Sequence, residues 1–267
     1  MTPLVEALAQ ELLTAGRSRT PIAPLTQRHP ELTIADAYAV QRAGLARLRV
    51  QGARVVGHKV GLTSLAMQEM LGVDQPDFGY LTSAMVSEDG AALAAGAFVA
   101  PRAELEIAFR LREPLHGAAL EVADVLAATE AVAPAIEVID SRIADWQLTI
   151  ADTVADNASS GHVVLGAWRP ADGLDLAALE GTLTVTGRDG EERVDGRGDA
   201  VLGHPATAVA WLARALHEYG GDGIDAGEIV LSGAMARAVP VAAGSAARGR
   251  VEQLGDVGVT FTEGSAR

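Results

Sequence analysis

Two glutamates share one face of the segment PRAELEIAF, residues 101–109. Side chains alternate across an extended chain, so Glu104 and Glu106 point to one side while the apolar residues around them point to the other. Two carboxylates this close repel each other, and a divalent cation such as Mg²⁺ is the simplest group that holds both ionised. The pattern predicts two ligands of a metal site, with a solvated face of an edge strand as the alternative.

A third carboxylate, Glu137, lies inside the apolar segment APAIEVIDSR, residues 133–142. A glutamate among apolar residues is costly unless it is paired or binds a metal. A second apolar strand with one embedded acid supplies the third ligand of a facial site. We therefore expect Glu104, Glu106 and Glu137 to hold one divalent cation.

Lys59 is the single lysine among the 21 lysine and arginine residues, and it lies in ARVVGHKVGLTS, residues 53–64. Alternation places Lys59 between Gly57 and Gly61 on one face, and His58 with two valines on the other. The glycines leave room for a compact ammonium, which can approach a bound carboxylate or oxyanion and whose pKa can fall on desolvation. We expect Lys59 to serve chemistry and His58 to be a packed core residue.

Two polar segments add further candidates. LGVDQPDFGYL (71–81) reads as a turn in which Asp77 is a general base, a water-positioning residue or a turn aspartate, and spacing alone favours the turn role. DTVADNASSG (152–161) predicts a polar loop after an apolar strand. In it, Asn157, Ser159 and Ser160 hydrogen-bond a substrate carboxylate or only satisfy the loop.

Short strands and few helices must position these residues. Helices are expected at 3–15, at 33–52 with a cap from Thr33 and Asp36, at 121–132 and at 204–220. Strands are expected in the segments 54–63, 102–111, 134–142, 182–194 with a hairpin turn at Asp189 and Gly190, 227–234 and 249–261. Runs of strands with few crossover helices favour an α+β fold with a mixed sheet, rolled or barrel-like, and peripheral helices. We expect residues 1–52 to form a helical appendage and 53–267 one catalytic domain.

Composition excludes several classes of function. A net charge of −14 disfavours nucleic acid and anionic membranes as partners. The absence of cysteine removes disulfides, thiolate metal sites and a cysteine nucleophile. No GxSxG elbow or dinucleotide-binding fingerprint occurs. An amphipathic N-terminal segment and the lack of roughly 18 consecutive apolar residues predict a cytoplasmic protein.

Six segments occur in a specific order over nearly the whole chain: GHKVGLTS, LGVDQPDFGYL, PRAELEIAF, PAIEVIDSRIADW, DTVADNASSG and LGHPATAVAWLA. Together they resemble the 2-oxopent-4-enoate (2-hydroxypentadienoate) hydratases of meta-cleavage pathways, in the fumarylacetoacetate hydrolase superfamily. The resemblance implies a mixed β-roll catalytic domain with Mg²⁺ or Mn²⁺ on a glutamate triad. It also implies a homo-oligomer, a pentamer or a decamer.

Carried over by motif, the ligands are Glu104, Glu106 and Glu137, the motif lysine is Lys59, and the PD(F/Y)G aspartate is Asp77. The implied substrate is a small 2-hydroxy-2,4-dienoate. The implied reaction protonates C5 and adds water at C4, giving a 4-hydroxy-2-oxoacid. Lys59 then balances charge at the substrate carboxylate or C2 oxygen, and Asp77 moves a proton or places the water.

Three rival functions share these motifs in part. A 2-oxo-3-hexenedioate (4-oxalocrotonate) decarboxylase uses the same triad, and an acylpyruvate hydrolase is disfavoured because no histidine pairs with a carboxylate as water activator. A non-catalytic subunit that partners a pathway decarboxylase is disfavoured by the intact triad and Lys59. A dioate substrate needs an extra cation, for which Arg142 is a weak candidate because Asp140 or Asp145 can pair with it.

Overall fold

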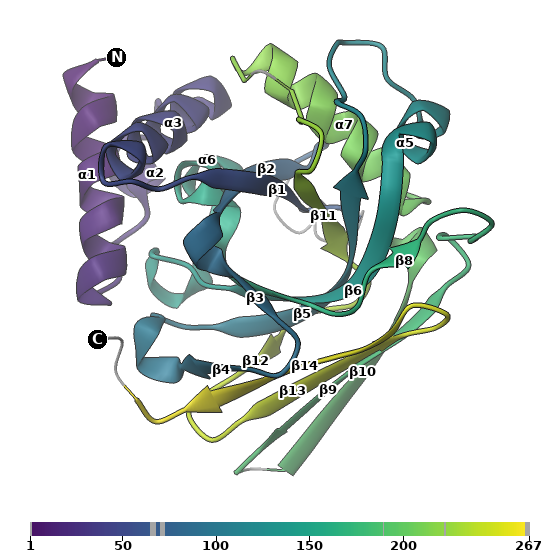
Figure 1. Ribbon diagram of the computed structural model, residues 1–267. Coiled ribbons are helices and arrows are strands. Elements are labelled where there is room, and N and C mark those ends of the chain that lie inside the picture. The colour runs from purple at the N-terminus through teal and green to yellow at the C-terminus, as the bar shows by residue number, and fades with distance from the viewer. Residues whose placement is uncertain (1, 65–67, 70–72, 189, 222, 265–267) are drawn as a thin grey trace.

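The computed structural model describes residues 2–64, 68–69, 73–188, 190–221 and 223–264. Two sheets face each other, and helices cover the larger one (Figure 1). The α-helices are α1 (Pro3–Ser18), α2 (Leu25–Arg28), α3 (Ile34–Val50), α5 (Val122–Ala128), α6 (Ile150–Ala155) and α7 (Pro205–Glu218). None of the helices in this described part is long and apolar enough to cross a membrane.

The larger sheet has nine strands and curls into a half-barrel (Figure 1). Its order is β2 (Asp77–Thr82), β1 (Val55–Gly61), β11 (Ile229–Ala234), β5 (Arg102–Leu111), β6 (Thr129–Ile139), β7 (Ser160–Leu165) and β3 (Val86–Glu88), with β12 (Val239–Pro240) beside β5 and β8 (Arg169–Pro170) beside β6. The β1–β11 and β3–β7 pairs are parallel and the other pairs are antiparallel. The expected mixed, rolled sheet is confirmed.

The smaller sheet has five strands and lies across the outside of the half-barrel (Figure 1). Its order is β10 (Gly190–Arg197), β9 (Glu180–Gly187), β13 (Ala246–Val251), β14 (Gly255–Thr262) and β4 (Ala91–Ala94). The expected hairpin joins β9 to β10, where Gly187 pairs with Gly190, whereas Asp189 of the expected turn lies outside the described residues.

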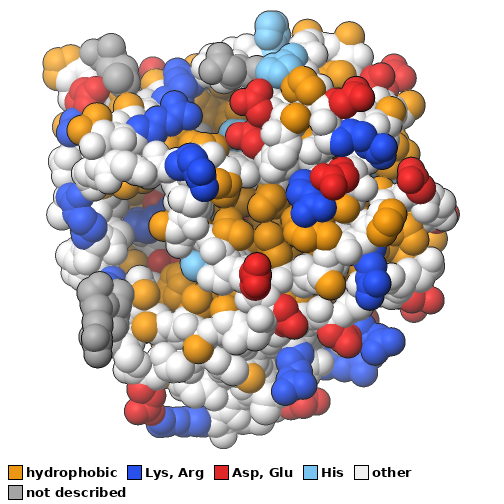
Figure 2. Space-filling view, in the orientation of Figure 1, with side chains coloured by type: hydrophobic (Ala, Val, Ile, Leu, Met, Phe, Trp, Pro, Cys, Tyr) orange, Lys and Arg blue, Asp and Glu red, His pale blue; other side chains and the backbone are white. Residues whose placement is uncertain are grey.

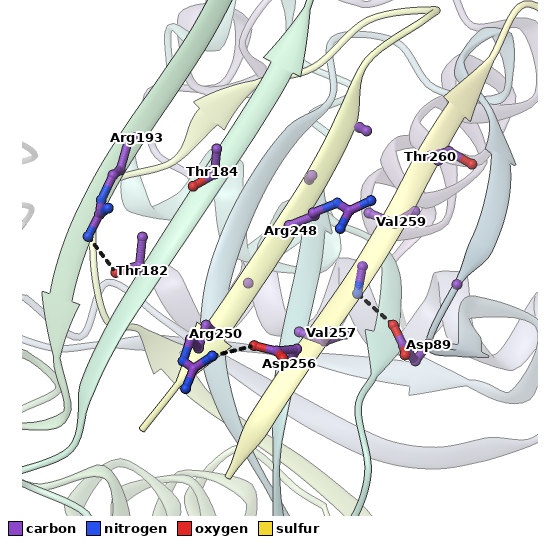
Figure 3. Close-up of a pocket in the computed structure, with 15 residues that line it drawn as sticks. Asp89, Thr182, Thr184, Arg193, Arg248, Arg250, Asp256, Val257, Val259 and Thr260 are labelled. Carbon is purple, nitrogen blue, oxygen red and sulfur yellow. Dashed lines mark hydrogen bonds and ion pairs between the residues drawn. The ribbon is translucent and has the colours of Figure 1, made fainter. Parts of the chain in front are cut away.

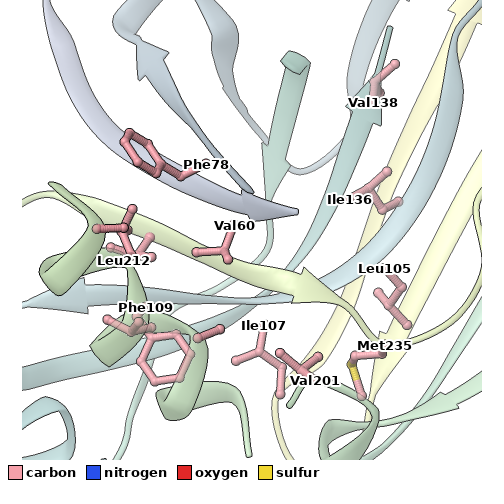
Figure 4. Packing of buried hydrophobic residues seen from close by; sticks show 14 of the residues in the cluster. Val60, Phe78, Leu105, Ile107, Phe109, Ile136, Val138, Val201, Leu212 and Met235 are labelled. Carbon is pink, nitrogen blue, oxygen red and sulfur yellow. The ribbon is translucent and has the colours of Figure 1, made fainter. Parts of the chain in front are cut away.

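One face of β5 and β6 belongs to the hydrophobic core, part of which lies between the two sheets (Figure 4). Leu105, Ile107 and Phe109 are buried there, which confirms their separation from the glutamates. Gly181 of β9 and Gly249 of β13 face Leu105, and a side chain on either glycine would approach it within 3.0 Å. Glycine therefore lets the two sheets pack closely at the level of the glutamates.

The N-terminal helices begin where the sequence predicts. Thr2 caps α1, and Thr33 forms a capping box with Asp36 at the start of α3, satisfying backbone amides that a helix leaves free. Gln41 of α3 donates to the backbone carbonyls of Phe78 and Val154, at 2.8 and 3.0 Å. These bonds tie α3 to strand β2 and helix α6, while the domain boundary at residue 52 stays a prediction.

Three expected elements differ from the structure. The helix expected over 121–132 ends at Ala128, and β6 starts at Thr129 because the β-branched and apolar residues that follow pair with β5. The expected turn at 71–81 contains strand β2, whose six residues are all buried. The expected loop at 152–161 falls partly in helix α6, which Thr149 caps together with Asp152.

Candidate active site

The three predicted glutamate ligands meet on the inner face of the curled sheet. Glu104 and Glu106 project from β5, and Glu137 on β6 is the direct register partner of Glu104. One carboxylate oxygen of each lies within 4.8 Å of the others. Glu106 and Glu137 are 1% and 0% exposed, so Glu104 alone of the three keeps partial access to solvent.

Crowding and burial disfavour the ionised form of all three carboxyls. Burial is the main cause that raises the pKa of Glu104 to about 7, and the negative charge of Glu137 is the second cause. Burial likewise raises the pKa of Glu106 well above its usual range, and it raises the pKa of Glu137 although the Lys59 ammonium opposes the shift. A cation among these oxygens would remove the repulsion.

The donor set fits a hard divalent cation. Among the described residues, neither oxygen of Glu137 has a hydrogen-bond partner although both are buried, and Glu106 accepts one bond, from the Gly233 amide at 2.7 Å. Buried carboxylate oxygens without partners are costly, whereas three carboxylates from two strands match the oxygen ligands that Mg²⁺ or Mn²⁺ takes in proteins. The structure thus brings together the three residues that the sequence pattern selected.

Lys59 lies beside this cluster. Its Nζ atom is 3.4 Å from a carboxylate oxygen of Glu137 and donates to the Ala158 carbonyl at 3.0 Å, and the residue is 3% exposed. Burial by itself lowers the pKa of the Lys59 ammonium, but Glu137 and Asp77 outweigh that effect and raise it. The fall in pKa that desolvation allows is therefore outweighed by the neighbouring carboxylates, and the net shift keeps Lys59 charged.

Asp77 opens strand β2 on the other side of Lys59 and is buried. Its carboxylate accepts a 3.0 Å hydrogen bond from the Thr153 hydroxyl of α6. Burial raises the pKa of Asp77, and the Lys59 charge and the Thr153 bond counteract this. A side chain at Gly61 would lie 2.2 Å from an Asp77 oxygen, so this glycine makes the space in which lysine and aspartate meet.

A short left-handed turn, Asn157–Ser159, forms the wall behind Lys59. All three residues have positive φ, at 55°, 49° and 53°, a conformation that costs non-glycine residues roughly 1–2 kcal/mol each. The turn presents the Ala158 carbonyl to Lys59. Strained backbone held in place by its surroundings is typical of functional sites, and here it directs a hydrogen-bond acceptor at the only lysine of the sequence.

The polar side chains of this loop that were expected to bind substrate differ in what they contact. Both polar atoms of the Asn157 amide bond the backbone of Tyr80, at 2.9 and 3.0 Å, which favours a role in holding β2 against the turn. The Ser159 hydroxyl is buried and has no hydrogen-bond partner among the described residues, and the same holds for the neighbouring Ser160 hydroxyl. Substrate binding by Asn157 and by Ser159 stays a prediction.

Two residues that surround the site were missed or misassigned from sequence. Thr153, whose hydroxyl donates to Asp77, lies four residues before Asn157 in the segment 152–161, which was expected to be a loop. Arg142 pairs with Asp156, with Nε 2.5 Å from the carboxylate, and not with Asp140 or Asp145 through their side chains. Burial raises the pKa of Asp156 to about 6, and Arg142 opposes that shift.

Other hollows lie away from the glutamates. One, of about 620 Å³, follows the outer face of the smaller sheet and is lined by arginines and threonines such as Arg248 and Thr184 (Figure 3). A second, of about 680 Å³, lies between α3 and α7 and has His58 in its wall, with a side chain that is only 12% exposed and lies 3.7 Å from Glu228. Neither contains a predicted ligand or Lys59.

The fold and the site place the chain in a known class. Residues 52–262 match the model of the fumarylacetoacetate (FAA) hydrolase C-terminal family, and the chain belongs to this family. It is 48% identical over 263 residues to the 2-hydroxyhexa-2,4-dienoate hydratase of Comamonas testosteroni, covering 97% of this chain and 98% of the relative. It is 47% identical over 220 residues to the 2-hydroxypent-2,4-dienoate hydratase of Pseudomonas putida, covering 81% and 97%.

A solved structure matches the whole architecture. The 4-oxalocrotonate decarboxylase of Pseudomonas putida G7, complexed with magnesium and adipate, superposes with a TM-score of 0.93 at 37% identity over 98% of both chains. The resemblance noted in the sequence is thereby confirmed at the level of the family.

Proposed function

We propose that the protein is a metal-dependent hydratase that adds water to a 2-hydroxy-2,4-dienoate, 2-hydroxypenta-2,4-dienoate or a close homologue. The observation that carries the proposal is the triad of Glu104, Glu106 and Glu137 with the charged Lys59 against it. Relatives of nearly the same length that are named as hydratases of such dienoates support it.

The three glutamates would hold a divalent cation, and Mg²⁺ or Mn²⁺ suits their oxygen ligands. When bound, the cation supplies Lewis acidity to the C2 oxygen of the substrate. The ammonium of Lys59 offsets negative charge that develops on the substrate carboxylate or on that oxygen, in a site from which water is largely excluded. A fixed charge in such an environment acts more strongly than in water.

Asp77 is the candidate for moving protons. The reaction removes the proton of the C2 hydroxyl and adds one at C5, and water then gives its hydroxyl to C4 and a proton to C3. A buried carboxyl whose pKa is raised above its ordinary value, and which Thr153 orients, can accept a proton and return it. The partnerless hydroxyl of Ser159 is available to the substrate carboxylate.

The test follows the ultraviolet absorbance of 2-hydroxypenta-2,4-dienoate with Mg²⁺ and with a chelator. We expect metal-dependent loss of the dienoate and, in D₂O, a 4-hydroxy-2-oxo product that carries deuterium at C3 and C5. Persistence of the dienoate with Mg²⁺ present would rule out the hydratase.

A second candidate is decarboxylation of a 2-oxo-3-hexenedioate, because a solved decarboxylase shares the fold over its full length. Both substrates carry a carboxylate next to an oxygen at C2, the head group that a cation on the triad would hold, so the triad and Lys59 fit either reaction. Release of CO₂ from the dioate, measured against formation of a hydroxylated product, separates the two.

We further propose that the enzyme assembles as a homo-oligomer, a pentamer or decamer, in the cytoplasm, and that it can associate with a pathway decarboxylase. The family resemblance supports these proposals. Light scattering of the purified protein tests the assembly, and co-purification with the decarboxylase tests the association.

A further inference from the structure

The inner face of β5 carries two arginines as well as the glutamates. Reading along every second residue, it runs Arg102, Glu104, Glu106, Ala108 and Arg110. Ala108 belongs to a small apolar cluster inside the curled sheet. Hydrophobic side chains likewise fill the middle of the face in Figure 2, where Figure 1 shows the opening of the half-barrel. Ala108 thus separates Arg110 from the glutamates, whereas nothing on the strand separates Arg102 from them.

Both arginines are stacked on tryptophan, but only one is paired. The guanidinium carbon of Arg102 lies 4.4 Å from the ring centre of Trp146, and that of Arg110 lies 4.7 Å from Trp168. Arg110 also donates to Glu130 at 3.0 Å. Across the described part of the chain, the Arg102 guanidinium makes no hydrogen bond and no ion pair. Its in-plane N–H donors are therefore available, since stacking occupies only the face of the group.

The stacking partner is held in an unfavourable backbone conformation. Asp145 and Trp146 have φ of 57° and 55°, in the left-handed region that costs non-glycine residues roughly 1–2 kcal/mol each. The preceding residue is anchored, because the Ala144 amide donates to the Ile22 carbonyl at 2.9 Å. This geometry fixes the indole under a half-buried arginine next to the metal ligands.

Among the cations that the described residues place near the glutamates, Arg102 is the one with free donors. Lys59 is engaged by Glu137 and Ala158, and Arg142 is committed to Asp156. Arg102 is close enough to Glu104 to lower the pKa of that carboxyl. Residues two apart on a strand are spaced by roughly 7 Å, and a six-carbon acid spans roughly 6 Å from C1 to C6 at about 1.5 Å per bond.

We propose that Arg102, whose guanidinium lies over the ring of Trp146, is a substrate-binding residue that receives a carboxylate of the substrate. The carboxylate is either that of the 2-oxo acid head at the metal or a second one at the far end of the chain. The first case suits a monocarboxylic dienoate, and the second suits a dioate. The inference rests on the proposed function for its substrate class, and it names Arg102 as the side chain that binds a carboxylate of that substrate.

Binding of two unreactive probes to the Mg²⁺-loaded protein tests the assignment by calorimetry without turnover. 2-Oxohexanoate and 2-oxoadipate share the metal-binding head and differ by one distal carboxylate. We expect Arg102→Gln to weaken the binding of 2-oxoadipate by about tenfold, as for loss of a charge-assisted hydrogen bond. Binding of 2-oxohexanoate weakens as well if Arg102 contacts the head group. Arg102→Lys should restore part of the affinity, and the matched control Arg110→Gln should change neither probe.

The pattern of loss identifies the carboxylate. A loss for 2-oxoadipate alone assigns Arg102 to the distal group, and an equal loss for both probes with unchanged Mg²⁺ affinity and melting temperature assigns it to the head. The proposal is overturned if Arg102→Gln leaves the affinity for both probes unchanged. It is also overturned if the loss of probe affinity accompanies a loss of Mg²⁺ affinity and Arg102→Lys does not restore it. Because the test measures binding and not turnover, it can be interpreted even if the protein does not hydrate the dienoate.

Discussion

The surroundings of the buried Glu137 carboxylate favour a bound cation. It has no solvent exposure, both its oxygens lack a hydrogen bond within the described part of the chain, and the nearest cation, Lys59, is 3.4 Å away. A buried carboxylate usually accepts several hydrogen bonds or stays protonated. Here Glu104 and Glu106 add negative charge instead of donors, which makes a fourth, cationic partner the arrangement that satisfies all three.

Replacing Glu137 with glutamine should weaken the binding of that cation. We expect Glu137→Gln to weaken Mg²⁺ binding by at least about tenfold, as for loss of one ion–ligand interaction, and to reduce turnover in proportion. Titration calorimetry with Mg²⁺ measures the affinity. Glu130→Gln, on the exposed end of the same strand, is the matched control and should bind Mg²⁺ like the parent. Equal affinities in the two variants would contradict the ligand role.

Lys59→Arg tests why this position has a lysine. The ammonium fits between Gly61, Glu137 and the Ala158 carbonyl, and a planar guanidinium is too broad for that space. Charge is retained, so we expect turnover to fall by about a hundredfold or more through misplacement while the protein stays folded. Steady-state kinetics and circular dichroism check this. Near-normal turnover would remove Lys59 from the mechanism.

At the scale of elements, strands β1 and β2 need glycine where they cross the site. A methyl group at Gly61 would lie 2.2 Å from an Asp77 oxygen, so Gly61→Ala should cost about 1–3 kcal/mol through overpacking and abolish turnover. A methyl group at Gly44, in the middle of α3, would meet no described atom within 4 Å. Gly44→Ala should therefore stabilise the protein by about 0.5–1 kcal/mol and leave turnover intact.

Chemical unfolding and kinetics of the two glycine variants give the comparison. The opposite signs arise because the same methyl group meets a carboxylate in one case and open space with better helix propensity in the other. If both variants change stability alike, the space around Asp77 is not what selects glycine at position 61.

The glutamates were predictable because their signal is local. Alternation along PRAELEIAF separates acid from apolar residues within one strand, and APAIEVIDSR embeds its acid in an apolar run, so pairing β5 with β6 was enough to join them. The position of Lys59 needed more. It reaches Glu137 because β1 pairs with β11, about 170 residues later, and no local pattern specifies that parallel pairing.

Elements with mixed signals were missed for a related reason. The residues of β2 include Asp77 and Gly79, which favour turns locally, but tertiary pairing with β1 overrides that preference. In α6 the threonines and aspartates read as a loop, whereas Thr149 and Asp152 cap the helix and Thr153 turns inward to Asp77. Arg102 was overlooked because the role proposed for it rests on its contact with Trp146, which forms only in the folded chain.

At the scale of the whole molecule, the proposed metal site would couple folding to binding of the cation. Strands β1, β2, β5 and β6, with helix α6, each contribute a residue, so the site exists only in the folded state. A ligand that binds only the folded state raises the free energy of unfolding by RT ln(1 + [L]/Kd), about 2.7 kcal/mol at a hundredfold excess over Kd. Thermal unfolding should therefore shift upward with Mg²⁺ and downward with a chelator.

The pH dependence of that shift has a defined sign. Without metal, burial raises the pKa of Glu104 to about 7, and the pKa values of Glu106 and Glu137 also lie above their ordinary value of 4.5. A carboxyl whose folded pKa is raised stabilises the fold below its unfolded pKa, and this contribution is lost as pH rises through the folded pKa. The metal-free protein should become less stable between about pH 5 and pH 8.

Mg²⁺ should reverse this trend, because it binds the ionised carboxylates and competes with protons for them. The gain in melting temperature on adding a fixed Mg²⁺ concentration should therefore grow from about pH 5 to about pH 8. Scanning calorimetry with Mg²⁺ or chelator at each pH measures the gain, and Glu137→Gln, with one ionisable ligand removed, should show a smaller gain and a flatter metal-free profile. A gain that is the same at both ends of the range would mean that the triad does not take up the cation as three ionised carboxylates.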